Sequence, residues 1–153
     1  MNERADRYEC FAPSRRRESH CAFDLSTVSG TIERANLEMC LIPQVLYEFW
    51  VVATRPVNVN GLGMSHSLSA QSVQRLIARY KFYRNYAGVF DRWQTLVTAH
   101  AVIGKTAHDA RLVAAMLSHT IGTILTLNTQ DFARYSQINT LSPNDVLAGK
   151  IPS

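Results

Sequence analysis

Three acidic side chains stand at positions where acids are unusual. From residue 39 onward the chain carries only five acids, which are Glu48, Asp91, Asp109, Asp131 and Asp145. Glu48 interrupts a strongly apolar segment, Asp109 falls in the first turn of an expected apolar helix, and Asp131 follows an expected buried strand. Acids are seldom found away from solvated surfaces unless they are paired or functional. These three acids are therefore the candidates for chemistry.

Carboxylates that converge repel one another unless a cation lies between them. Mg²⁺ or Mn²⁺ is the natural choice, because hard cations prefer oxygen ligands. Such an ion activates water and holds a phosphate oxygen, which is the chemistry of phosphodiester hydrolysis. Zinc is not indicated, because no His or Cys pair has the spacing of zinc ligands. The pattern predicts a metal site formed by Glu48, Asp109 and Asp131.

Each of these residues also has a purely structural explanation. Glu48 could pair with Arg55, and Asp109 could simply favour the positive end of its helix. Asp131 could cap a short helix that follows it. Asn128, which precedes it in the same segment, could be an ordinary turn residue. Their combination in one chain favours the functional interpretation.

The elements that must position the acids alternate between short apolar runs and helical patterns. Apolar runs predict strands, which cover residues 39–42, 123–127 and 138–141. Apolar residues at helical spacing predict helices, which cover residues 43–54, 67–83, 91–101 and 106–117. This alternation predicts an α/β sandwich with a mostly parallel sheet. Ligands of such sheets bind beyond the carboxyl ends of the strands, where Glu48 and Asp131 are expected.

Composition supports one folded domain with an unusual beginning. The chain has 153 residues, of which 46% are hydrophobic and 18% are charged, and this excludes a disordered or collagen-like chain. Periodicity is poor before residue 37. We interpret residues 1–36 as an atypical, poorly structured N-terminal segment, residues 37–145 as the domain, and residues 146–153 as a C-terminal tail.

Cysteine content and hydropathy predict a cytoplasmic protein. The chain has three cysteines, a small and odd number that is not typical of a disulfide scaffold. The polar N-terminus predicts no secretory signal, and the longest uncharged stretch, residues 112–130, is broken by polar residues and glycine in its middle. The formal net charge of +4 permits a polyanionic partner.

Three short segments also occur in an order and spacing typical of one family. They are Ile42–Trp50 (IPQVLYEFW), Gly104–Val113 (GKTAHDARLV) and Leu125–Phe132 (LTLNTQDF). These segments resemble the PIN-domain ribonucleases, above all the VapC-like toxins of bacterial toxin–antitoxin pairs. The resemblance implies an α/β/α sandwich, RNA cleavage dependent on Mg²⁺ or Mn²⁺, an antitoxin partner and frequent homodimers. It assigns metal-site roles to Glu48, Asp109 and Asp131, with Asn128 as a supporting residue.

One feature of that family is not found in this sequence. Its members open with an apolar strand that ends in an Asp-Thr-Asn-like motif, whose Asp is a principal metal ligand. This chain has no such motif, so its first strand is expected to be atypical or missing. Asp6 and Asp24 are the candidates for the absent acid. The departure favours an alternative function, a catalytically inactive PIN-like protein that only binds an antitoxin or a dimer partner.

A basic strip with interleaved aromatic residues supports a third alternative. Its cations are Arg75, Arg79, Lys81, Arg84 and Arg92, and its rings are Tyr80, Phe82, Tyr83, Tyr86 and Trp93. Cations on phosphates and rings on bases would bind RNA. The alternative is a solvated basic face above an aromatic core. On the strip alone, the protein would be a nucleic-acid-binding domain without catalysis.

Overall fold

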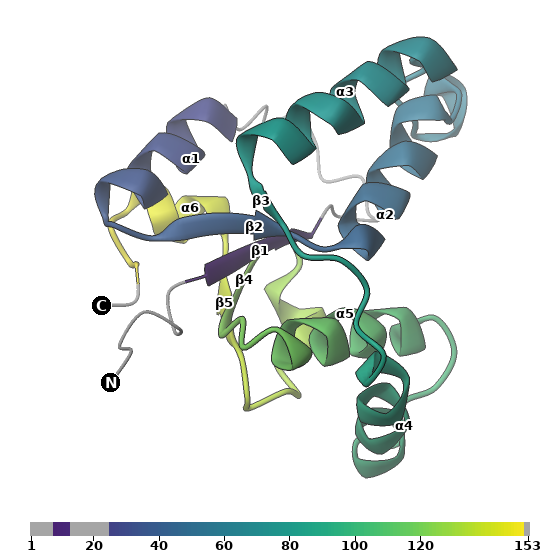
Figure 1. Cartoon of the computed structure of the whole chain (residues 1–153), viewed down its shortest axis with the longest axis vertical. Coiled ribbons are helices and arrows are strands. Elements are labelled where there is room, and N and C mark those ends of the chain that lie inside the picture. The colour runs from purple at the N-terminus through teal and green to yellow at the C-terminus, as the bar shows by residue number, and fades with distance from the viewer. Residues whose placement is uncertain (1–7, 13–24, 152–153) are drawn as a thin grey trace.

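A parallel β-sheet forms the centre of the molecule in a computed structural model that describes residues 8–12 and 25–151 (Figure 1). Within these residues the sheet has five strands in the order β3-β2-β1-β4-β5, and every neighbouring pair is parallel. The strands are β1 (Tyr8–Ala12), β2 (Glu38–Leu41), β3 (Lys81–Phe82), β4 (Thr123–Thr126) and β5 (Asn139–Leu141). The predicted parallel sheet is confirmed.

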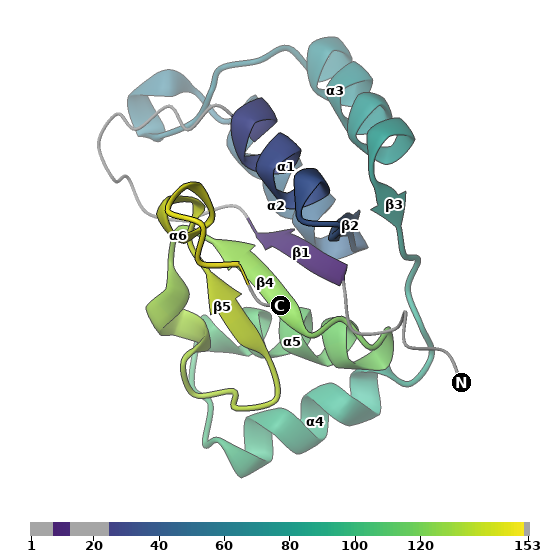
Figure 2. The same ribbon diagram turned by 90° about the vertical axis from the view of Figure 1, so that its left-hand side faces the viewer.

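Helices lie on both sides of this sheet. The α-helices are α1 (Leu25–Arg34), α2 (Pro43–Thr54), α3 (His66–Arg79), α4 (Val89–Ala99), α5 (Thr106–Ser118) and α6 (Pro143–Leu147). Two short 3₁₀ helices are η1 (Val57–Val59) and η2 (Thr129–Phe132). The pair α4 and α5 covers the side of the sheet opposite α1 and α3 (Figures 1 and 2). The molecule is therefore the expected three-layer α/β/α sandwich.

The core extends to both sides of the sheet, with α5 on one side and residues such as Val28 and Ile32 of α1 on the other. All four residues of β4 are buried, as expected for a strand covered on both faces. Ala110, Val113 and Ala114 of α5 are fully buried, and such small side chains let the helix approach the sheet closely. Cys40 of β2 is also fully buried in this core.

Local sequence signals set both ends of α2 as predicted, and a serine caps the start of α3. Pro43 is the first residue of α2, where its missing N–H costs no hydrogen bond. The helix ends before Pro56, which forces Arg55 into an extended conformation. The hydroxyl of Ser65 accepts a hydrogen bond from Leu68 N and caps α3, slightly earlier than expected.

Three expectations are corrected. Residues 1–36 were expected to be poorly structured and the first strand atypical or missing, but β1 is the central strand and α1 precedes residue 37. The helix expected over 67–83 ends at Arg79, because the next residues pair with β2 as β3. The expected C-terminal tail begins inside α6, whose start is fixed by a reciprocal Ser142–Asp145 capping box.

Hydropathy excludes one role for the described helices. None of the helices in residues 25–151 combines the length and the apolar character that crossing a lipid bilayer requires.

Candidate functional site

The two strands that flank β1 lead directly to two of the predicted acids. β2 ends at Leu41 and is followed by α2, which carries Glu48 in its second turn. β4 ends at Thr126 and is followed by η2, which contains Asp131. Because both strands are parallel to β1 and adjacent to it, these acids leave the same edge of the sheet.

Gln44 connects Glu48 to the start of α5. Its side-chain Nε2 donates to Glu48 Oε1 at 3.1 Å and to the backbone carbonyl of His108 at 2.8 Å. Gln44 is only 6% exposed, so both hydrogen bonds are sheltered from water. Two acceptors that share one donor nitrogen lie close together. The structure therefore places Glu48 beside the first turn of α5, where Asp109 lies.

Asp109 and the segment after β4 are also near one another. α5 contacts η2, and Asp109 is half-buried. Burial raises the pKa of the Tyr135 hydroxyl, and the nearby negative charge of Asp109 raises it further, whereas Arg134 opposes the shift. An effect of this kind requires Asp109 to lie within electrostatic reach of Tyr135.

Asp131 does not cap a helix but contacts the side chain of Asn128. It lies inside η2 and not before it, so the capping interpretation is wrong. The side-chain amide of Asn128 donates a hydrogen bond to Asp131 Oδ2. Asn128 therefore contacts the Asp131 carboxylate, and its supporting role at a metal site stays a prediction.

Arg111 brings a cation to the same region. Its guanidinium donates to Gln44 Oε1 at 3.0 Å, so the Gln44 amide uses its oxygen and its nitrogen at once. The carboxylate of Glu48, the carbonyl of His108 and the guanidinium of Arg111 are thus organised by one buried side chain.

A complete metal site is not found among the described residues. Within residues 27–151, whose side chains the structure describes, no three His, Cys, Asp or Glu side chains are grouped so that they could hold an ion. Asp6 and Asp24, the candidates for the missing acid, lie outside the described residues. The metal roles of Glu48, Asp109 and Asp131 remain predictions.

Comparison with solved structures identifies the architecture. VapBC-1 from nontypeable Haemophilus influenzae has a similar chain, with a TM-score of 0.59 and 12% identity over 90% of this chain and 98% of that one. A DNA-bound VapBC from Salmonella typhimurium has a chain with a TM-score of 0.60 and 16% identity, over 90% of this chain and 98% of that one. VapBC2 from Rickettsia felis, bound to a promoter DNA fragment, has a chain with a TM-score of 0.57 and 10% identity, over 88% of this chain and 98% of that one. The chain has the PIN-like fold.

Sequence comparison adds nothing to this result. No protein-family model matches the chain, and no curated protein matches it by sequence. The resemblance predicted from three short segments is thus confirmed for the fold. At identities of 10–16%, chemistry must be argued from the residues present.

The basic strip spans several elements of this PIN-like fold. Arg79 forms an ion pair with Glu33 of α1 at 3.3 Å and also donates to Ser29, so it has a structural role. Arg84 lies in the segment after β3, whereas Arg92 lies on α4. The strip is thus divided among several elements, although all five of its cations are exposed.

Gln44 is the residue that the sequence analysis missed. It lies four residues before Glu48, on the same face of the PIN-like fold's α2. The sequence offers no signal for it, because an amide in the first turn of a helix is common. Its contact with α5 links residues 64 positions apart, which no local pattern reveals.

Proposed function

We propose that this chain is a metal-dependent endoribonuclease that hydrolyses RNA phosphodiester bonds as the toxin of a toxin–antitoxin pair. The observation that carries the proposal is the Gln44 bridge, which joins the Glu48 carboxylate to the turn of α5 that carries Asp109. Asp131 leaves the same edge of the sheet. Acids that leave the same edge of a sheet are groups that a divalent cation can bring together.

The donors fit Mg²⁺ or Mn²⁺ in their chemistry, because carboxylate and amide oxygens are ligands that hard cations prefer. Their number does not suffice among the described residues, where no group of three such side chains could hold an ion. When bound, a divalent ion supplies charge for the scissile phosphate and acidifies a water molecule. Metal binding is therefore the first property to measure.

The chain's own residues would orient these groups. Gln44 fixes the Glu48 carboxylate, and Asn128 fixes the Asp131 carboxylate. Arg111, held by Gln44, supplies a cation that would position a backbone phosphate of the RNA. Rigid orientation of this kind lowers the entropy cost of reaction, because little rearrangement is needed when substrate binds.

The partners follow from the same proposal. The similar solved structures are VapBC complexes, and we extend their assembly to this chain, which would bind a cognate antitoxin and form a homodimer. Its substrate would be RNA in the cytoplasm.

A cleavage assay tests the enzymatic part. Purified protein is incubated with 5′-labelled RNA at increasing Mg²⁺ or Mn²⁺, and Mn²⁺ binding is measured separately by calorimetry. We expect metal-dependent cleavage that EDTA abolishes and that Glu48→Gln, Asp109→Asn and Asp131→Asn strongly reduce. Asp91→Asn alters an exposed acid of α4 and serves as the matched control that retains activity. Cleavage that survives all three substitutions would exclude this site.

The second candidate is a catalytically inactive PIN-like protein that binds an antitoxin or a dimer partner. The absence of a three-residue metal group from the described residues favours it. It predicts no cleavage at any metal concentration and no Mn²⁺ binding by calorimetry, while the fold and its association with a partner persist.

A further inference from the structure

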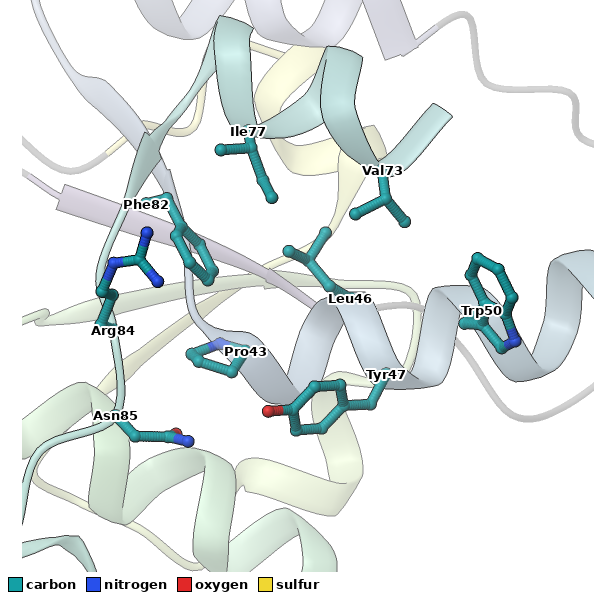
Figure 3. A pocket seen from close by; sticks show the side chains of 9 residues that line it. All are labelled: Pro43, Leu46, Tyr47, Trp50, Val73, Ile77, Phe82, Arg84 and Asn85. Carbon is teal, nitrogen blue, oxygen red and sulfur yellow. The ribbon is translucent and has the colours of Figure 1, made fainter. Parts of the chain in front are cut away.

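A groove between α2, α3 and the segment after β3 adjoins the candidate site. It holds about 530 Å³. Leu46, Val73 and Ile77 form its aliphatic wall, as Figure 3 shows. Its other lining residues are Pro43, Tyr47, Trp50, Phe82, Arg84 and Asn85. The groove therefore combines apolar and aromatic walls with a guanidinium and an amide at one end.

This groove lies directly beside the Glu48 face of α2. Tyr47 precedes Glu48, and Pro43 precedes Gln44, which is bonded to Glu48. Successive residues of a helix point about 100° apart, so groove and acid occupy adjacent faces of one helix. A chain whose phosphate lay against the acids would have its next base within reach of the groove.

The polar end of the groove is held in place before any ligand binds. Tyr83 N donates to Leu41 O at 2.8 Å, which fixes the segment after β3 to the sheet. His119 Nε2 is hydrogen-bonded to Arg84 O at 2.9 Å, and the rings of Tyr83 and His119 are in contact, with centroids 4.8 Å apart and planes tilted by 38°. Arg84 and Asn85 therefore project from an anchored backbone.

The aromatic groups remain available for stacking. Tyr47 is 58% exposed and Trp50 is 38% exposed, although both lie at a groove. The Arg84 guanidinium lies 5.7 Å from the centroid of the Phe82 ring, so charge and ring are already paired at one end. Aromatic rings beside an arginine are typical of proteins that bind single-stranded nucleic acid.

We propose that this groove binds one unpaired base of the RNA, next to the bond that is cleaved. The base stacks on the aromatic walls around Tyr47, and Asn85 hydrogen-bonds to its polar edge, since an amide offers both a donor and an acceptor. Arg84 contacts the adjoining phosphate. The proposal rests on the proposed ribonuclease function and deepens it, because it specifies the part of the molecule that receives a base of the RNA.

A protein segment is the competing occupant. The polar end of the groove favours RNA, since a guanidinium and an amide match a phosphate and a base edge together. The net charge of +4 favours a polyanion as well.

Binding without metal separates this proposal from catalysis. Fluorescence anisotropy of a labelled 12-nucleotide single-stranded RNA is measured in EDTA, with an RNA duplex of the same length for comparison. We expect Tyr47→Leu to weaken binding of the single strand about tenfold, the scale of one stacked base, and to leave the duplex unaffected. Phe90→Leu is the matched control, because Phe90 is an equally exposed ring of α4 outside the groove.

Two further variants define the polar end. Arg84→Gln should weaken binding of the single strand and reduce the salt dependence of that binding. Arg92→Gln on α4 should have neither effect. Asn85→Ala should weaken binding of the single strand without changing the salt dependence of that binding. Circular dichroism of each variant verifies that the fold is retained.

Specific outcomes would overturn the proposal. It is wrong if Tyr47→Leu binds the single strand as the wild type does, or if Phe90→Leu loses as much affinity. If Tyr47→Leu loses self-association in sedimentation while its RNA binding stays intact, the groove binds a second copy of the chain instead. Glu48→Gln should keep single-strand binding, so failure of the nuclease assay alone would leave this result standing.

Discussion

Gln44 Nε2 donates a hydrogen bond to Glu48 Oε1 across 3.1 Å, one turn further along α2. The same nitrogen reaches the carbonyl of His108 on α5. A single amide therefore sets the position of an acid on one helix relative to the start of another. This relationship makes Gln44 a positioning residue.

Replacing this amide tests the bridge. Gln44→Leu should lower the free energy of unfolding by about 1–3 kcal/mol, because the His108 carbonyl and the Arg111 guanidinium lose a sheltered partner. It should also weaken the apparent affinity for Mn²⁺ by about 10- to 100-fold, as changes to residues that orient ligands typically do. Urea denaturation and calorimetry measure the two effects.

The matched control is Gln74→Leu, which makes the same change at an exposed position of α3. It should leave both quantities near the wild-type values. Equal destabilisation by the two substitutions would show that the buried bridge contributes nothing of its own.

Gly61 provides a prediction about the loop between α2 and α3. A Cβ at this position would collide with the backbone carbonyl of Arg55. Gly61 N also donates to Pro56 O at 3.0 Å, so the loop is held close to the end of α2. Gly61→Ala should therefore lower the free energy of unfolding by about 1–3 kcal/mol, the usual cost of overpacking.

Gly122 supplies the control for this substitution. A Cβ there meets no atom within 4 Å, so Gly122→Ala should be tolerated. Chemical denaturation of both variants decides the matter, and similar stabilities for the two would contradict the steric explanation.

Much of the fold could be predicted from sequence because its signals are local. Pro43 and Pro56 delimit α2, and the β-branched run around Ile124 predicts β4. β3 was missed because it has only two residues and gains its strand conformation from pairing with β2. β1 was missed for the same reason, since its ladders with β2 and β4 are long-range contacts and its sequence has no continuous apolar run.

The candidate site also contains residues that the sequence marks and one that it does not. Glu48, Asp109 and Asp131 were recognisable because an acid in an apolar context is unusual at each position. Gln44 was not, because an amide in a helix has no such contrast. Its importance comes from a hydrogen bond to a residue 64 positions away, which depends on how α2 and α5 pack.

Asp145 makes the stability of α6 dependent on pH. Hydrogen bonds from the Ser142 hydroxyl and from Ser142 N lower the pKa of its carboxyl below the ordinary 3.8. A lowered folded-state pKa stabilises the protein above the unfolded-state value, and this stabilisation disappears as the pH falls through the folded-state pKa. Asp145→Asn should therefore lower Tm more at pH 7 than at pH 2.

Asp91→Asn, at an exposed acid in the first turn of α4, is the control for general charge effects. Thermal melts of both variants at the two pH values make the comparison. A Tm difference for Asp145→Asn that stayed constant from pH 7 to pH 2 would rule out the carboxylate as its source.

Tyr135 is the described residue whose buried polar atom lacks a partner. Its side chain is 1% exposed, and within residues 27–151 its hydroxyl makes no hydrogen bond. Its ring packs edge-on against His100, with centroids 5.0 Å apart. Tyr135→Phe removes the unsatisfied hydroxyl and keeps the ring, so it should raise the free energy of unfolding by about 1 kcal/mol.

The pH dependence distinguishes this explanation from a change in packing. Burial raises the pKa of Tyr135 above 10.0, so the unfolded chain releases the proton first and the wild type loses stability above pH 10. The advantage of Tyr135→Phe should therefore widen between pH 8 and pH 11 in urea denaturation. Tyr86→Phe, at a 58% exposed ring, should show no such widening. A wild type as stable as Tyr135→Phe at both pH values would mean that the hydroxyl has a partner in solution.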